Sequence, residues 1–299
     1  VGDGFHNVVF SGDIHYTDTR LFNGVSNDFP RAETLVMEST YGRRDDYQTD
    51  QDDSERKLRK LINETYDNGG KIVIPAFAVG RSQELMLVLE EAMREGDIPT
   101  MPVYLDGMIR GATAIHTAYP NFLRDDLRER ILHEDENPFL ADQFQQVDGG
   151  RDMRERIAHD GDQCIILSTS GMVTGGPIMS WLRLLGGDPE NALVFVGYQA
   201  QGTLGRRIQS GRREIPFEDR RSENRQLTLR FDVESVSGFS GHADRNGLEN
   251  FVRTMSPRPE RILCVHGDES STDQLSSGLY QEFDVRTHAP RNLETFRFD

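Results

Sequence analysis

KIVIPAFAVGRSQELMLVLEEAMREGDIPTMPVYL, residues 71–105, contains a short apolar run, a long amphipathic stretch and a second apolar run. The runs at 71–75 and 102–105 are typical of buried strands, because they are short and, apart from Lys71, apolar. Residues 81–95 between them have the length and periodicity of a helix. A strand, a helix and a second strand in this order indicate a βαβ unit on a parallel sheet.

The same alternation continues on both sides of this unit. A helix is expected at about 52–67, and strands are expected at about 163–168 and 192–197, with helices between them. This pattern predicts an α/β fold. Towards the end of the chain the expected elements are strands within 226–236, a helix at 244–255, a strand at 261–265 and a helix at 272–282.

The domain layout is predicted to be discontinuous. Two short strands, 7–10 and 34–37, precede the alternating region, and the pattern changes after Gly42. A polar, arginine-rich stretch from 210 to 225 marks the other boundary. We therefore expect one domain made of residues 1–45 and 217–299, with a second domain, residues 46–216, inserted between its two parts.

Four polar residues follow expected strands. Asp13 lies just past strand 7–10, Glu38 follows strand 34–37, and two histidines stand in Ser240-Gly-His-Ala-Asp244 and Val265-His-Gly-Asp268. Open α/β sheets carry their chemistry at the carboxyl ends of the strands. Taken singly, each residue is explained as well by a turn, a cap or a solvated acid, so the interpretation depends on their combination.

The combination resembles the β-CASP branch of the metallo-β-lactamase nucleases, and within it the archaeal homologues of the cleavage and polyadenylation specificity factor. The resemblance covers essentially all 299 residues. It implies an incomplete metallo-β-lactamase αββα domain with an inserted parallel-sheet β-CASP domain. The motifs that carry it, in the family's order, are Phe10-Ser-Gly-Asp13, Met37-Glu-Ser-Thr-Tyr-Gly42, residues 75–85, residues 168–177, Phe239-Ser-Gly-His-Ala-Asp244, Val265-His-Gly-Asp268 and Asn292-Leu-Glu-Thr295.

The resemblance implies a role for each of the four residues. Asp13 matches the aspartate that bridges two zinc ions, and His266 matches the last histidine ligand of that pair. His242 would be the general acid, and Glu38 would orient it and favour its charged form. Two zinc ions held by a bridging carboxylate can activate a hydroxide and neutralise a phosphate in reaction.

The function that this resemblance implies is zinc-dependent endoribonuclease activity in RNA 3′-end formation or turnover, with 5′-to-3′ exoribonuclease activity as an addition. A catalytically silent RNA-binding or scaffold subunit is the alternative, although such a subunit usually lacks some of the four residues. A DNA-repair nuclease is a third reading. DNA-acting members tend to carry valine where His266 stands.

One departure from the family concerns the remaining zinc ligands. They normally come from an upstream His-x-His-x-Asp-His segment and one more histidine, and the eight histidines of this chain do not show that spacing. The chain starts with Val1 and opens almost directly on the Asp13 strand. We therefore expect it to be the C-terminal portion of a longer protein, inactive alone.

Three loops in the expected insert are candidates for RNA contacts. Arg81 opens a helix after a strand, Ser170 and Gly171 lie in a glycine-rich turn, and Arg206 and Arg207 follow another strand. Helix starts and guanidinium groups can receive phosphates. Each loop also has an interpretation without RNA. The first would be a helix cap by Ser82, the second a turn that binds no ligand, and the third a solvated linker. The family resemblance implies that these loops face the metal site and line an RNA groove.

Charge composition indicates the environment of the protein. The chain has 50 acidic and 34 basic residues, a net charge of −16, and only three of the bases are lysine. Acid excess with scarce lysine is typical of a high-salt cytoplasm, so we expect a halophilic archaeal protein.

Although nucleic-acid binding favours a basic surface, a local cluster of arginines can provide such a surface on an acidic protein. That cluster comprises Arg206, Arg207, Arg212, Arg213, Arg220, Arg221 and Arg225.

Location and assembly are also predicted from the sequence. Without a run of about 18 apolar residues or a secretory signal, we expect a cytoplasmic protein that does not enter membranes. Cys164 and Cys264 lie in apolar strand patterns, which favours buried thiols over a disulfide.

Residues 292–298 alternate like a strand and resemble the family's dimer-forming end, so we expect a homodimer. An ordinary closing strand is the alternative.

The zinc content of the chain alone tests this reading. A closed zinc site takes about four ligands per ion, and the resemblance assigns only Asp13 and His266 as ligands. We expect isothermal titration calorimetry to detect no tight binding of two zinc ions. A stoichiometry of two, lost on replacing His266 with alanine, would refute the expectation.

Overall fold

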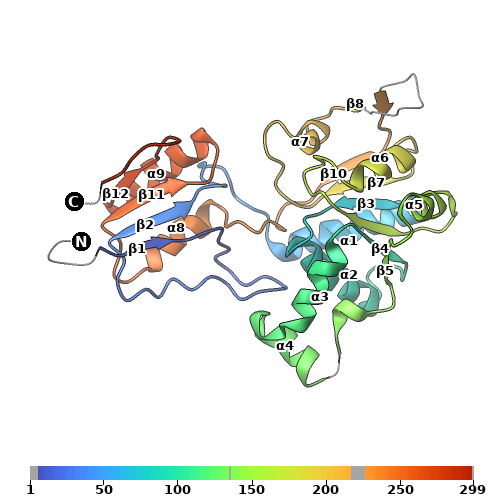
Figure 1. The fold of residues 1–299 in the computed structure, drawn as a ribbon, viewed down its shortest axis with the longest axis horizontal. Coiled ribbons are helices and arrows are strands. Elements are labelled where there is room, and N and C mark those ends of the chain that lie inside the picture. The colour runs from blue at the N-terminus through green and yellow to red at the C-terminus, as the bar shows by residue number, and fades with distance from the viewer. Residues whose placement is uncertain (1–5, 135, 217–225, 298–299) are drawn as a thin grey trace. The chain divides into compact units, whose positions relative to one another are not determined.

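The computed structural model describes residues 6–134, 136–216 and 226–297, and their contacts divide the chain into two compact units. Within the described residues, unit 1 comprises 6–19, 23–48 and 241–297. Unit 2 comprises 20–22 and the described part of 49–240. The long segment of unit 2 leaves unit 1 and returns to it, so it is inserted in the chain of unit 1 (Figure 1).

Unit 2 is built on a parallel sheet of six strands, in the order β10-β7-β3-β6-β4-β5. This confirms the α/β class with parallel strands that the alternation predicts. The strands are β3 (Ile72–Pro75), β4 (Val103–Asp106), β5 (Phe144–Gln146), β6 (Ile165–Ser168), β7 (Ala192–Phe195) and β10 (Asp232–Ser235).

Both faces of this sheet are covered, which explains why its central strands β7, β3 and β6 are mostly apolar and buried throughout. In β3, Ile72 and Ile74 face one core and Val73 faces the other, and all three side chains are fully buried. The helices of the first core are α1 (Gln51–Asp67), α2 (Arg81–Glu95), α3 (Ile109–Ala118) and α4 (Asp125–Leu132). Those of the second are α5 (Gly150–His159), α6 (Ile178–Leu185) and α7 (Leu204–Gln209).

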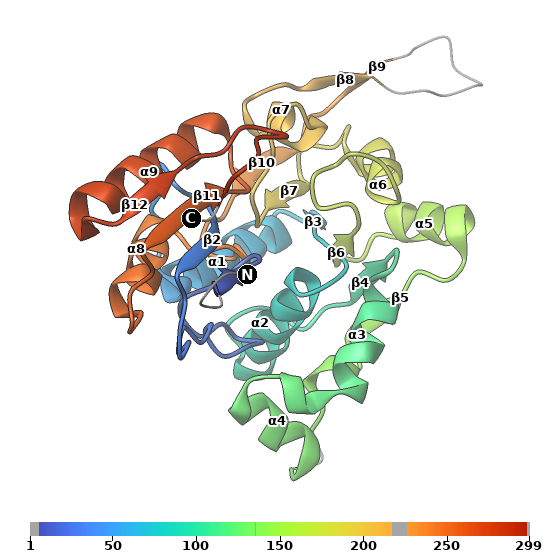
Figure 2. The same ribbon diagram turned by 60° about the vertical axis from the view of Figure 1, so that its left-hand side comes forward.

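Unit 1 is also an α/β layer. Its four strands are all parallel, in the order β1-β2-β11-β12. Helices α8 (Arg245–Thr254) and α9 (Glu269–Phe283) share one core with Leu35, Met37 and Ile262, so both pack on the same face of the sheet (Figure 2). The strands are β1 (Val8–Phe10), β2 (Thr34–Glu38), β11 (Arg261–Val265) and β12 (Arg286–His288).

Several predicted element bounds need correction. The strands expected within 226–236 are present but belong to two sheets: β9 (Gln226–Thr228) pairs antiparallel with β8 (Glu214–Pro216), and β10 joins β7. Because β10 belongs to the sheet of unit 2, the chain returns to unit 1 at Gly241, later than the expected boundary at 217. The helix expected at 272–282 begins earlier, at Glu269.

The C-terminal tail forms no strand within its described residues, 292–297. Glu294 instead pairs with Nε2 of His288 at 2.8 Å, and the ring of Phe296 lies 5.0 Å from the His288 ring. Residue 298 of the predicted stretch lies outside the described part. Of the described helices, none is both long and apolar enough to cross a bilayer.

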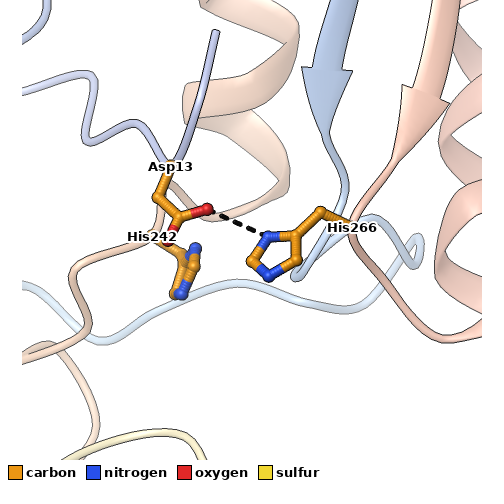
Figure 3. A group of neighbouring side chains, drawn as sticks. All are labelled: Asp13, His242 and His266. Carbon is orange, nitrogen blue, oxygen red and sulfur yellow. Dashed lines mark ion pairs between the residues drawn. The ribbon is translucent and has the colours of Figure 1, made fainter.

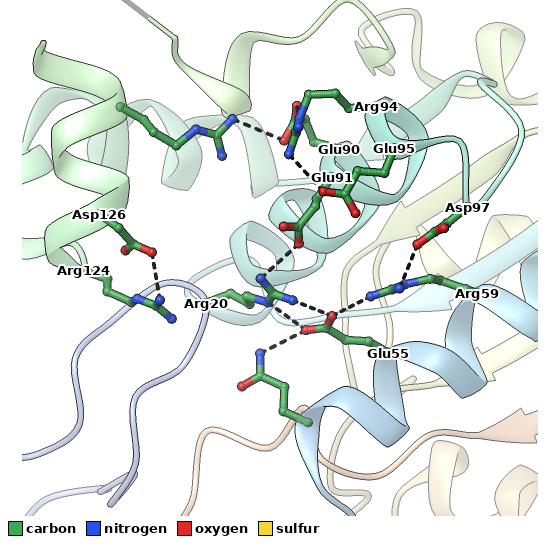
Figure 4. A network of polar contacts seen from close by, with 12 residues as sticks. Arg20, Glu55, Arg59, Glu90, Glu91, Arg94, Glu95, Asp97, Arg124 and Asp126 are labelled. Atoms are coloured by element: carbon green, nitrogen blue, oxygen red, sulfur yellow. Dashed lines mark hydrogen bonds and ion pairs between the residues drawn. The ribbon is translucent and has the colours of Figure 1, made fainter. Parts of the chain in front are cut away.

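A buried ion-pair network explains why Arg20 to Phe22 belong to unit 2 (Figure 4). Both oxygens of Glu55, whose side chain is fully buried, accept hydrogen bonds from Arg20 at 2.8 and 2.9 Å. Arg59 donates to the same carboxylate at 2.9 Å, and Arg20 also pairs with Glu91 at 3.0 Å. Burial raises the pKa of Glu55, but the bonds and charge of Arg20 outweigh it, so the pKa lies below its ordinary 4.5.

Replacing Glu55 with glutamine removes the buried charge that Arg20 and Arg59 share, and leaves them only the more exposed Glu91 and Asp97 as acidic partners. We expect Glu55→Gln to lower the free energy of unfolding by about 3 kcal/mol at neutral pH, since breaking a buried pair costs that much. A carboxylate with a lowered folded-state pKa stabilises fully above its unfolded value, and loses the effect as pH falls below about 4.5. The deficit should therefore shrink in acid.

Urea unfolding between pH 3 and 7 measures this deficit. Glu64→Gln is the matched control, because Glu64 lies on the same helix with its side chain 57% exposed. A deficit of the same size in both variants, or one independent of pH, would contradict the account.

Candidate active site

The carboxyl ends of three neighbouring strands of unit 1 bring the predicted residues together. Glu38 is the last residue of β2, His266 directly follows β11, and Asp13 lies three residues after β1. Because β1, β2 and β11 are adjacent and parallel, their carboxyl ends meet at one edge of the sheet. His242 reaches this edge from the loop before α8.

Asp13, His242 and His266 form a compact cluster (Figure 3). Each offers one ligand atom, and these atoms lie within 4.8 Å of one another. Oδ1 of Asp13 is 3.0 Å from Nδ1 of His266, and the two imidazole rings are 5.6 Å apart, centroid to centroid. Asp13 therefore meets two histidines that lie more than 200 positions later in the sequence.

Glu38 orients one imidazole of this cluster, that of His242. Its side chain is buried, and Oε2 lies 2.8 Å from Nδ1 of His242. The other oxygen, Oε1, accepts the backbone N–H of Ile14 at 2.8 Å. Since the carboxylate is acceptor-only when ionised, Nδ1 of His242 carries the proton of this bond. The same carboxylate thus fixes the ring of His242 and the backbone next to Asp13.

Thr40 and the turn at His266 fix the backbone that carries the second imidazole. Oγ1 of Thr40 lies 3.2 Å from Nδ1 of His242 and donates to the backbone oxygen of His266 at 3.2 Å. The N–H of Ser39 donates to that oxygen as well, at 3.3 Å. His266 has a φ of 52°, and Gly267 follows it because a Cβ there would lie 2.5 Å from the Ser39 oxygen.

Two imidazoles and one carboxylate are donors that zinc accepts in proteins. Within the described residues, this is the one group of three or more histidine, cysteine or acidic side chains close enough to hold an ion. Asp13 and His266 are largely exposed, which leaves their ligand atoms accessible. The chemistry of the donors fits a metal, and their number is below the four of a closed zinc site.

The three candidate RNA-binding loops of unit 2 lie at one edge of its sheet. They follow β3, β6 and β7, which are neighbours in the sheet. Two hydrogen bonds join the loops after β6 and β7: Gly205 N–H donates to the Met172 oxygen at 3.1 Å, and Gln199 Nε2 donates to the Gly171 oxygen at 2.9 Å. The strand order therefore brings the three predicted RNA-binding loops to the same edge of the sheet.

Individually these residues differ in what they can offer a phosphate. Arg81 is only 10% exposed and pairs with Glu84. Ser170 Oγ accepts the N–H of Thr174 at 2.9 Å, and Gly171 is buried. Arg206 and Arg207 are exposed on α7. Of the other clustered arginines, Arg212 is exposed and Arg213 half-buried, while Arg220, Arg221 and Arg225 lie outside the described residues.

The alternative of a helix cap by Ser82 is wrong. Ser82 is buried and its hydroxyl donates to the Phe77 oxygen at 2.6 Å, while Gly80 is the N-cap of α2 and makes no side-chain bond. Both cysteines are buried and free, as predicted. Burial raises the pKa of the Cys164 thiol to about 12, which makes it unreactive.

Comparison with known proteins adds two matched regions. Residues 82–208 match the Beta-Casp domain, and residues 226–290 match the family described as a Zn-dependent metallo-hydrolase RNA specificity domain. The chain belongs to the β-CASP family. This confirms the resemblance inferred from the motifs. His242 and His266 lie inside the second region, whereas Asp13 and Glu38 precede both, so the structure alone connects all four.

Curated archaeal relatives match almost the whole chain, and each is named transcription termination factor FttA. Identity is 49% over 297 residues with the protein of Methanosarcina mazei, and 50% over 297 residues with that of Methanothermobacter thermautotrophicus. The match covers 99% of this chain and 46% of each relative. This β-CASP chain therefore spans about half the length of the curated relatives it matches.

Some contributing residues were not predicted. Thr40 stands within the Glu-Ser-Thr-Tyr-Gly motif, which is the only signal of its role. Gln48 donates from Nε2 to the His242 oxygen at 2.8 Å, and the backbone N–H of Ile14 bonds to Glu38. Neither contact has a pattern in the sequence, because each depends on which segments fold together.

The Glu38–His242 bond makes a prediction about proton position. In Glu38→Gln the amide oxygen must still accept the Ile14 N–H, which turns the amide NH₂ towards Nδ1 of His242. We expect the neutral ring to move its proton from Nδ1 to Nε2. Nitrogen-15 chemical shifts of the labelled imidazole report this change directly.

The exposed Glu260→Gln is the matched control in unit 1, and it should leave the His242 spectrum unchanged. A proton that remains on Nδ1 in Glu38→Gln would show that the buried carboxylate does not set the tautomer.

Proposed function

We propose that this chain supplies the catalytic acid and part of the metal site of a longer β-CASP protein that cleaves RNA with the help of zinc. One observation carries the proposal: Asp13, His242 and His266 offer ligand atoms within 4.8 Å of one another, with Glu38 bonded to His242. Two imidazoles and a carboxylate at one sheet edge suit phosphodiester hydrolysis, in which a charged phosphate and a leaving oxygen need stabilisation.

Each residue has a distinct task in this proposal. Asp13 and His266 would hold metal, with two zinc ions in the complete site, and bound zinc would activate water and neutralise phosphate charge. His242 delivers a proton to the leaving oxygen of the ribose. Glu38 holds His242 in position through Nδ1 at 2.8 Å and favours its protonated form. Arg206 and Arg207 bind the RNA backbone, and Arg81, Ser170 and Gly171 shape the same edge of unit 2.

The biological setting follows from the relatives. They are named transcription termination factors, and a matched family carries the description RNA specificity domain. We propose that the whole protein cleaves nascent RNA to form 3′ ends at termination, by endonuclease action with 5′-to-3′ exonuclease activity in addition. A silent RNA-binding subunit is the second candidate. It is disfavoured because all four residues are present and assembled.

The domain assignment and assembly belong to the same proposal. Unit 1 would be part of a metallo-β-lactamase domain and unit 2 the β-CASP domain. β1 is at the edge of its sheet and Phe10 on it is 74% exposed, so further strands could pair there. A homodimer through the tail, a cytoplasmic location and a halophilic source remain predictions of the sequence.

Cleavage of a labelled single-stranded RNA by the full-length protein in zinc tests the function. His242→Ala should slow cleavage by about 10³-fold, as expected on losing a general acid, while RNA affinity stays within about twofold. His159→Ala, a surface histidine at the end of α5, should cleave normally. Cleavage unaffected by His242→Ala would remove its role. Absence of cleavage by the unmodified protein, with RNA binding intact, would favour the silent subunit.

A further inference from the structure

A cavity of about 620 Å³ in unit 2 has no part in the site described above. It lies between α3 and the segment 139–148, which includes the edge strand β5. The face of α3 towards it carries the small residues Ala114, Thr117 and Ala118, and this leaves the space unfilled. Its volume is within the range of small-molecule sites, about 300–1,000 Å³.

Two side-chain oxygen atoms in the wall of this cavity have no hydrogen-bond partner among the described residues. Oγ1 of Thr117 and Oε1 of Gln146 are buried and make no hydrogen bond to any described residue. Thr113, one turn earlier on α3, donates normally to the Ile109 oxygen, so the missing bond is particular to Thr117. Burying a polar atom without a partner destabilises the fold, so both atoms call for an explanation.

The rest of the wall is apolar and aromatic, with one charged pair. Phe139 and Phe144 line the cavity, and Arg110 and Asp148 also border it. Nη1 of Arg110 lies 3.6 Å from Oδ2 of Asp148, and both side chains are about two-thirds exposed, so their attraction is weak. Both charged groups remain accessible to a ligand at the opening of the cavity.

These features together specify a ligand. It needs a flat apolar body for the aromatic wall, and polar edge groups for an amide and a hydroxyl. It also needs a hydroxyl or phosphate for Asp148 and Arg110. An apolar side chain of a protein partner would fill the space and leave Thr117 and Gln146 unpaired. A nucleotide meets every requirement, since its base has N–H and acceptor groups on its edge and stacks on aromatic rings.

We propose that this cavity binds one nucleobase of single-stranded RNA. Rotation about the last side-chain torsion of Gln146 turns its amide towards the base, and such torsions are soft. Thr117 takes a second edge group, Asp148 accepts a ribose hydroxyl, and Arg110 pairs with the phosphate. The proposal rests on RNA being the substrate, and it adds a base-selective contact to a protein whose other expected contacts are to the backbone.

The test uses the four ribonucleoside 5′-monophosphates, AMP, GMP, CMP and UMP, each titrated into the full chain. Methyl resonances of Ala114 and Ala118, observed by NMR, report occupancy of the cavity. We expect at least one nucleotide to shift both signals and to bind more tightly than the others. Gln146→Leu should weaken that binding about tenfold, and Thr117→Val about threefold.

Gln145→Leu is the matched control. Gln145 is exposed on the same strand, and its side chain points to the opposite face because strand side chains alternate. It should bind like the unmodified chain. Thermal unfolding of each variant shows that the fold is retained, and Thr117→Val preserves shape if Gln146→Leu does not fold.

Two results would overturn the inference. One is that no nucleotide moves the Ala114 and Ala118 signals at about 10 mM, a weak limit for any specific site. The other is that Gln146→Leu and Thr117→Val bind as tightly as the unmodified chain. RNA affinity of the Arg206→Glu, Arg207→Glu double variant is measured separately. If the double variant loses RNA affinity but no nucleotide enters the cavity, this inference alone is refuted. If a nucleotide occupies the cavity but the protein cleaves no RNA, the proposed function alone is refuted.

Discussion

The hydrogen bonds of one buried carboxylate hold the candidate site together. Glu38 is 1% exposed, and an ionised carboxylate is tolerated at such a position only when both oxygens have partners. One oxygen accepts the Ile14 N–H, and the other bonds to His242. Without either partner the charge would be costly to bury. The carboxylate therefore connects the Asp13 loop, the end of β2 and the loop of His242 in a single arrangement.

The parallel arrangement of the strands explains why the candidate functional residues lie at one edge of each sheet. In unit 1, neighbouring strand ends deliver Asp13, Glu38 and His266 to the same edge. In unit 2, the adjacent strands β7, β3 and β6 do the same for the glycine-rich and arginine-bearing loops. Each sheet edge is thus an assembly point for residues distant in sequence, while cores on the sheet faces keep the strands in register.

Much of this could be predicted from the sequence, because local patterns determine it. The apolar run before Arg81 and the periodicity of 81–95 gave β3 and α2 to within a residue. The four site residues were recognisable from short motifs. The contacts between segments that are distant in the sequence could not be predicted in this way. The pairing of β10 with β7, which moves the return to unit 1 to Gly241, depends on strand contacts that no local pattern encodes. The ion pair that occupies Arg81 and the unpaired atoms of the cavity are likewise properties of the fold.

The convergence of the two histidines is the central claim, and one NMR measurement tests it most directly. In a deuterated chain with protonated histidine, ring protons of His242 and His266 should give a nuclear Overhauser cross-peak, since the ring centroids are 5.6 Å apart. The peak should vanish in His266→Ala. Well-resolved signals from both rings without a cross-peak would contradict the account, because the two histidines would then not share a site.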